Sequence, residues 1–183
     1  MEISEAIKKR RTIHSFSKKS VPSEIVEKAI FAANQAPCHR KTFPWRFTRI
    51  GSKKRELLYQ LQLTLKFGSE PTNDSSLEKI RDKMLNPSHL LIASQLCNEN
   101  QAQKHEDYAA CACAIQNLSL SLVEDDVGCK WSTGKITTDP KTYRLAEINP
   151  IEEEIIGFIW IGYGTIPPLI KRPATSSIYR ELE

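Results

Sequence analysis

Four short motifs that mark common enzyme classes are missing from the 183-residue sequence. It contains no GxGxxG, GxxxxGK[ST], HExxH or GxSxG. These absences leave Rossmann dinucleotide binding, P-loop chemistry, zinc proteolysis and the usual serine-hydrolase elbow without support. The histidines at positions 14, 39, 89 and 105 show no metal-ligand spacing with one another or with the cysteines, so we expect no metal centre.

Long apolar runs are missing as well. No stretch approaches the ~20 apolar residues that a membrane-spanning helix requires. The beginning of the chain also lacks an apolar segment followed by a small-residue cleavage site, as a secretory signal would have. The cytoplasm is therefore the expected compartment.

Cysteine pairing is not indicated either. The five cysteines form no CxxC motif, and an odd number leaves one over in any disulfide scheme, so we expect reduced thiols. Cys111 and Cys113 lie in a helical pattern, where a spacing of two points side chains to nearly opposite sides. These two thiols should neither bond to each other nor share a metal.

The overall composition is that of an ordinary globular protein. Apolar residues make up 40% and charged residues 26%, and the length suits one domain over residues 1–183. The formal charge of +4 mildly favours anionic ligands, but acidic runs at 124–126 and 152–154 give the surface both signs. Nucleic acid is not implied.

Hydrophobic periodicity predicts both helices and strands. The expected helices are a short one before Arg10, a second from about residue 22 up to Pro37, and others near 53–66, 77–85, 105–123 and 139–148; the expected strands are 47–50, 89–97, 128–131 and 154–163. Their spacing is irregular, and two helices precede the first strand. This order favours an α+β layer architecture.

Two segments carry additional expectations. The 105–123 helix is apolar in nearly every direction, which predicts burial on all sides, either in the core or across a subunit interface. Residues 68–76 are rich in Gly, Pro, Asn, Asp and Ser, and we expect a flexible connection there.

The segment Arg10 to Phe16, RRTIHSF, admits two interpretations. Cations at a helix end offset the helix dipole and bond its free carbonyls, which accounts for most Arg-Arg pairs of this kind. Two guanidinium groups followed by Thr12 also suit a phosphate, because guanidinium binds phosphate through paired hydrogen bonds. The local sequence leaves both open.

Three further segments combine polar or cationic side chains with aromatic ones or with turns. Each also has a structural explanation: Lys171-Arg172 as a solvated basic tail, Pro44-Trp45 as a packing anchor, and Ser132-Thr133-Gly134 as a simple turn. A nucleophilic Cys38 beside His39 is disfavoured, since adjacent loop residues usually point apart. The segments are Lys171-Arg172, the cationic loop His39-Arg40 before Pro44-Trp45, and Trp131-Ser132-Thr133-Gly134.

Taken in order, five segments resemble the nitroreductase family of FMN-dependent oxidoreductases, especially its short single-domain members. They cover nearly the whole chain, and five matches in the same order make chance agreement improbable. They are RRTIHSF, QAPCHRKTFPWRF, the Ala-rich helix ending in AIQNLSL, GCKWSTG, and EEIIGFIWIGYG followed by KRP.

The resemblance implies a three-layer α-β-α fold with a central mixed sheet, forming an intertwined homodimer with one FMN at each of two interface sites. Arg10, Arg11 and Thr12 would hold the phosphate and ribityl end, and Lys171 and Arg172 would close on the phosphate. The loop with His39 and Phe43 would come from the other subunit. The isoalloxazine ring would be lined by Trp131, Ser132 and Thr133, with a backbone amide near Thr133 as donor to flavin N5.

Related enzymes take a hydride from NADH or NADPH onto N5 and then reduce a nitroaromatic or a quinone, so no catalytic side chain is assigned. Two alternatives stay open: a flavin-binding or flavin-sequestering protein on this fold without nicotinamide turnover, and a small basic protein binding another phosphate ligand. Three positions depart from the family pattern: Phe43 replaces a frequent Gln, Cys38 replaces Ser or Asp, and His14 replaces a longer cation. These departures, and the short chain, leave the acceptor open.

Overall fold

The structure is a computed structural model that describes residues 1–68 and 73–182. The α-helices are α1 (Ile3–Lys9), α2 (Ser23–Ala33), α3 (Ser52–Phe67), α4 (Asp74–Leu85), α5 (Gln101–Val123), α6 (Lys135–Thr138) and α7 (Pro140–Ala146). The strands are β1 (Trp45–Arg49), β2 (His89–Leu96), β3 (Gly128–Ser132) and β4 (Glu153–Gly162), and 3₁₀ turns occur at His39–Lys41 and Thr175–Ser177.

The strands form one sheet in the order β1-β2-β4-β3. Each neighbouring pair is antiparallel, with Trp45 opposite Gln95 and Cys129 opposite Ile161. The expectation of a mixed sheet is therefore wrong for these four strands. Parallel pairing in the described residues is limited to an isolated bridge between Thr12 and Cys129.

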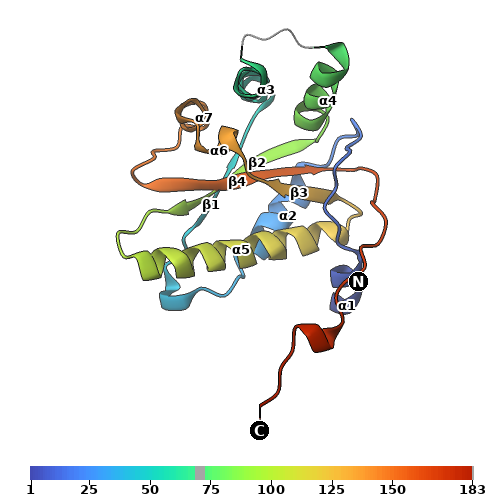
Figure 1. Ribbon diagram of the computed structural model, residues 1–183, viewed down its shortest axis with the longest axis vertical. Coiled ribbons are helices and arrows are strands. Elements are labelled where there is room, and N and C mark those ends of the chain that lie inside the picture. The colour runs from blue at the N-terminus through green and yellow to red at the C-terminus, as the bar shows by residue number, and fades with distance from the viewer. Residues whose placement is uncertain (69–72, 183) are drawn as a thin grey trace.

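Helices cover both faces of the sheet, so the three-layer α+β architecture is confirmed (Figure 1). The face toward α2 and α5 packs around residues such as Ala29, Leu91 and Leu118. The face toward α3, α4, α6 and α7 packs around Leu58 and Phe158. Trp45 is buried in the first core, with its Nε1 donating to Asn34 Oδ1 at 3.1 Å, so Pro44-Trp45 is a packing anchor.

Helix α5 is buried on one side only. Ala110, Ala114 and Leu118 face the sheet, whereas Ala109 and Cys113 are exposed in the single chain. The expectation that this helix lies wholly inside the core is wrong, because no described layer covers its outer face. A subunit interface on that face stays a prediction. As the spacing requires, Cys111 is buried and Cys113 is not, and burial raises the pKa of the Cys111 thiol to about 12.

The flexible connection predicted over residues 68–76 overlaps the start of a helix. Helix α4 already begins at Asp74, because the Asn73 side chain accepts a hydrogen bond from the Ser76 amide at 2.8 Å and caps the helix. Residues 69–72 lie outside the described residues. Helix α6 was not expected; its four residues are too few to give a periodic signal. In the described part of the chain, no helix is both long and apolar enough to cross a membrane.

Candidate functional site

The segment that follows α1 lies along the outer edge of β3. The Ile13 amide donates to the Cys129 carbonyl at 3.1 Å. Further along, the Ser17 amide donates to the Tyr163 carbonyl at 2.8 Å, so the same segment also contacts the end of β4. This approach requires Gly128, since a Cβ there would lie 2.2 Å from an Ile13 side-chain carbon. The packing places Arg10 and Thr12 beside the strand that ends at Ser132.

The two arginines have different environments. The Nη1 atom of Arg11 donates to the carbonyls of Lys8 at 2.5 Å and Arg10 at 2.8 Å. Arg11 therefore bonds the free carbonyls at the end of α1, as the first interpretation of the Arg-Arg pair expects. The Arg10 side chain forms no hydrogen bond or ion pair with the described residues. Its guanidinium lies close enough to Cys129 to oppose the rise in the thiol pKa that burial causes there. Arg10 therefore has all of its guanidinium donors available for a ligand, whereas the Nη1 of Arg11 is already engaged at the end of α1.

Trp131 is fixed in place by a bulge in β4. The register shifts opposite Ala93 and Ser94, and Gly157 in this bulge has a φ of 157°. A Cβ on Gly157 would lie 2.1 Å from Trp131 Nε1, so the indole packs directly against the bare backbone. The same Nε1 donates to the Ile156 carbonyl at 3.2 Å. The ring thus has both a packing surface and a satisfied polar atom.

The turn after β3 leaves backbone donors free. Ser132 Oγ accepts a hydrogen bond from Trp160 Nε1 at 2.9 Å, which fixes the end of the strand. Thr133 and Gly134 are exposed, and the Thr133 amide has no hydrogen-bond partner among the described residues. This amide is therefore available to a ligand, as a donor to flavin N5 would have to be.

A cavity of about 360 Å³ lies beside this turn, between β3, α3 and α4. Phe158 and Trp160, in an edge-to-face contact of 5.8 Å, form part of its wall. Three lysines line it, Lys66, Lys83 and Lys135, and no carboxylate does. None of these lysines pairs with a carboxylate in the described part of the chain. The cavity is electrostatically suited to an anionic or electron-rich ring ligand.

Lys130 adds a further cation on the same face of β3. Its Nζ lies 3.3 Å from His14 Nδ1. Lys130 therefore places a cation beside His14, the residue that stands where the resembled family often has a longer cationic side chain. Burial, and then repulsion from Lys83, lower the pKa of Lys130. The four lysines were missed from the sequence. Only Lys130 had a local signal, because it alternates with Ser132 inside GCKWSTG.

The other predicted site residues lie elsewhere in the single chain. His39 and Phe43 precede β1, which forms the opposite edge of the sheet from β3. His39 Nδ1 is 2.8 Å from Glu106 Oε2, and Phe43 is exposed. Lys171 and Arg172 are exposed on an extended tail that leaves the sheet beside α1 (Figure 1). Within one chain, the structure unites Arg10 and Thr12 with Trp131–Thr133 but not with these residues.

Together, the three-layer fold and the lysine-lined cavity at the β3 edge define a class: an α+β protein with a site for an anionic, ring-bearing ligand. A sequence profile of the Nitroreductase family matches residues 7–163. The chain belongs to the nitroreductase family, and the resemblance carried by the five segments is confirmed.

Individual relatives agree with this assignment. YfhC of Bacillus subtilis (strain 168), whose name assigns it provisionally to the NAD(P)H nitroreductases, is 30% identical over 169 residues that span 91% of this chain and 86% of its own. A nitroreductase-like family protein from Bacillus cereus superposes with a TM-score of 0.83 at 24% identity, covering 100% of this chain and 97% of its own. A nitroreductase with bound FMN from Bacteroides fragilis NCTC 9343 superposes with a TM-score of 0.73 at 22% identity, with 100% of both chains covered. These two structures establish the shared fold.

Proposed function

We propose that this protein is an FMN-dependent oxidoreductase that passes hydride from NADH or NADPH to a small organic acceptor. The observation that carries the proposal is the β3 edge. There, a cavity lined by three lysines and no carboxylate lies beside the Thr133 amide, and Arg10 lies along the same strand. Family membership supports the same conclusion.

The groups present at this edge fit FMN. Its phosphate needs charge-assisted donors, which Arg10 and the Thr12 hydroxyl can provide. Its flat ring system needs an apolar surface and a few backbone donors, which Phe158 and Trp160 in the cavity wall and the Thr133 amide can provide. Trp131 packs toward Tyr108 of α5, on the other face of the sheet. Arg11 would then act mainly at the end of α1, where its hydrogen bonds already lie.

When bound, FMN supplies the hydride chemistry through its N5 atom. The protein contributes orientation and charge. Lys66, Lys83, Lys130 and Lys135 create a positive field that favours the additional negative charge of a reduced ring. No acid or base side chain on this edge is needed for proton transfer in that scheme.

We also propose that the protein is a cytoplasmic homodimer in which each cofactor contacts both subunits. The site lies at the β3 edge, whereas His39 and Phe43 lie beyond the β1 edge, so one chain cannot surround a ligand with all the predicted residues. The exposed face of α5 carries Ala109 and Cys113, small residues that permit close helix packing. A second subunit on this face would bring its own His39 loop to the cofactor, and Lys171 and Arg172 could then close on the phosphate.

The acceptor follows from the family only as a class: a nitroaromatic, a quinone or a similar electrophile. Phe43 is half-exposed and contacts Trp45 edge-to-face at 5.9 Å between centroids, so it offers an aromatic surface where many relatives have an amide. This substitution favours flat, apolar acceptors.

An absorbance spectrum of the purified protein, followed by anaerobic mixing with NADH or NADPH, tests the proposal. We expect a yellow dimer whose flavin bleaches on mixing and recovers on addition of a quinone or nitroaromatic. A flavin-sequestering protein would stay yellow. A preparation that stays colourless after addition of FMN would contradict both flavin functions, and a monomer that retains FMN on size-exclusion chromatography would contradict the interface site.

A further inference from the structure

The loop Cys38–Phe43 has an unfavourable backbone conformation. Three of its residues, none of them glycine, have positive φ angles: Arg40 at 60°, Lys41 at 54° and Phe43 at 43°. Such angles are disfavoured for residues with a Cβ and persist only where surrounding contacts impose them. The loop therefore depends on contacts outside its own backbone.

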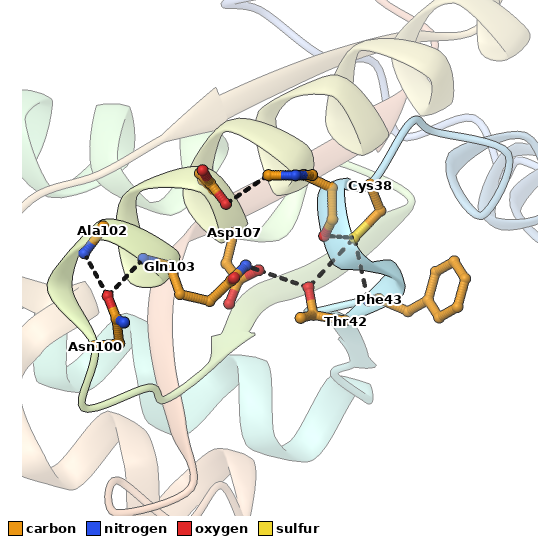
Figure 2. A network of polar contacts seen from close by, with 9 residues as sticks. Cys38, Thr42, Phe43, Asn100, Ala102, Gln103 and Asp107 are labelled. Carbon is orange, nitrogen blue, oxygen red and sulfur yellow. Dashed lines mark hydrogen bonds and ion pairs between the residues drawn. The ribbon is translucent and has the colours of Figure 1, made fainter.

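Those contacts come from a buried carboxylate on α5 (Figure 2). Thr42 Oγ1 donates to Asp107 Oδ1 at 2.6 Å, and Gln103 Nε2 donates to the same oxygen at 2.9 Å. Asp107 is only 3% exposed. Burying a carboxylate is costly unless it is hydrogen-bonded, so both donors are strongly held.

The hydroxyl proton of Thr42 determines the direction of the remaining contacts. Because that proton is donated to Asp107, the 3.3 Å contact between Thr42 Oγ1 and Cys38 Sγ can be a hydrogen bond only with the thiol as donor, and the single thiol proton is shared between this contact and the His39 carbonyl at 3.6 Å. The Phe43 amide in turn donates to Cys38 Sγ at 3.2 Å. A continuous series of hydrogen bonds thus runs from Phe43 through Cys38 and Thr42 to Asp107, as Figure 2 shows.

The start of α5, which carries Gln103 and Asp107, is held in place by its own cap. The Asn100 side chain caps α5 by accepting hydrogen bonds from the amides of Ala102 at 3.0 Å and Gln103 at 3.2 Å. One residue before Asp107, Glu106 pairs with His39 at 2.8 Å, but both side chains of that pair are well exposed. An exposed pair contributes little, so the buried Asp107 contact is the stronger attachment.

We propose that Asp107 is a positioning residue of the cofactor site: through Thr42, it holds loop Cys38–Phe43 in the conformation that presents His39 and Phe43 to FMN bound by the partner subunit. The proposal rests on the proposed function. It adds a residue that does not touch the cofactor and to which the resemblance assigns no role.

The test compares Thr42→Val, which keeps the shape and loses the donor, with Thr42→Ser, which keeps the donor. Asp107→Asn weakens the acceptor without changing its shape, and Thr64→Val, at an exposed hydroxyl on α3, is the control for a threonine-to-valine change. In dimeric apoprotein, we expect Thr42→Val and Asp107→Asn to accelerate deuterium exchange in a peptide covering residues 38–45. Thr42→Ser and Thr64→Val should exchange there like the wild type.

FMN titration of the same proteins gives the functional readout. Thr42→Val and Asp107→Asn should raise the Kd for FMN about tenfold, and Thr42→Ser about twofold at most. At saturating FMN, the visible circular dichroism of the flavin should also change in the first two variants only, which a general loss of stability would not produce. If the wild type binds FMN and Thr42→Val binds it equally well, the positioning role is wrong while the proposed function stands. A wild type that binds no FMN would overturn both.

Discussion

The two edges of the sheet use their polar groups in opposite ways. At the β3 edge, Arg10 and the Thr133 amide form no hydrogen bond with the described residues, and no lysine that lines the cavity pairs with a carboxylate there. At the β1 edge, the side chains of His39 and Thr42 are bonded to α5, and Cys38 Sγ is bonded within the loop. The β3 edge therefore keeps hydrogen-bond donors available for a ligand, whereas the hydrogen bonds at the β1 edge fix the conformation of the loop. A shared site between two subunits would need one of each.

The largest expected effect separates Arg10 from its neighbour. Arg10→Ala should weaken FMN binding by about 1.5–3 kcal/mol, because it removes charge-assisted hydrogen bonds to the phosphate. Arg11→Ala should instead lower the stability of the apoprotein by about 0.3–1 kcal/mol, through loss of its contacts at the end of α1. FMN titration and urea unfolding of both variants check this. Equal losses of FMN affinity would mean that both guanidinium groups bind the phosphate.

The next prediction concerns the rigid support of the β3 edge. Gly157→Ala should destabilise the protein by about 1–3 kcal/mol, because the new methyl group would overlap the Trp131 indole. Urea unfolding measures the loss, and a shift in tryptophan emission of the native state would report the displaced ring. Gly51→Ala is the control, since a Cβ at Gly51 meets nothing within 4 Å. Similar stabilities of the two variants would show that Trp131 is not held by the bulge.

The smallest expected effect concerns Lys130, which is partly exposed. Lys130→Met should weaken FMN binding by up to about 1 kcal/mol near neutral pH. Burial and Lys83 lower its pKa, so at alkaline pH the wild type must take up a proton to present a charge to the ligand. The affinity of the wild type should therefore fall more steeply than that of Lys130→Met as the pH rises.

The stability of the apoprotein should respond in the opposite direction. Between the lowered pKa of folded Lys130 and its value in the unfolded chain, the unfolded state binds more protons, so stability rises with pH there. Lys130→Met should lack this contribution. If the wild type and Lys130→Met show the same pH dependence of FMN affinity and the same pH dependence of the free energy of unfolding, Lys130 does not titrate at the site.

The helices and strands could largely be predicted from the sequence because their signals are local. β4 is recognisable from its dense β-branched and aromatic residues, and α5 from its length. The sequence left open whether the outer face of α5 lies in the core or at a subunit interface, since Ala and Cys suit buried and exposed positions alike. The parallel bridge between Thr12 and Cys129 joins segments far apart in the chain, which periodicity cannot reveal.

The candidate site was only partly predictable for the same reason. Arg10, Thr12 and Trp131–Thr133 could be identified from short motifs. Lys66 and Lys83 reach the cavity only because α3 and α4 pack against the sheet, and nothing in their local sequence marks them. Asp107 follows Glu106 in the polar first half of α5, where neighbouring carboxylates give no indication that a loop depends on one of them.

The hydrogen bonds between the segment around Ser15 and the end of β4 also determine when the site can form. The Ser17 amide donates to the Tyr163 carbonyl, and the Thr165 amide donates back to the Ser15 carbonyl, so the segment before α2 is held by residues that follow β4. Contacts of such long sequence separation form slowly. The segment that carries Arg10 therefore takes its final position only after β3 and the residues that follow β4 have formed, which makes the candidate site a late product of folding.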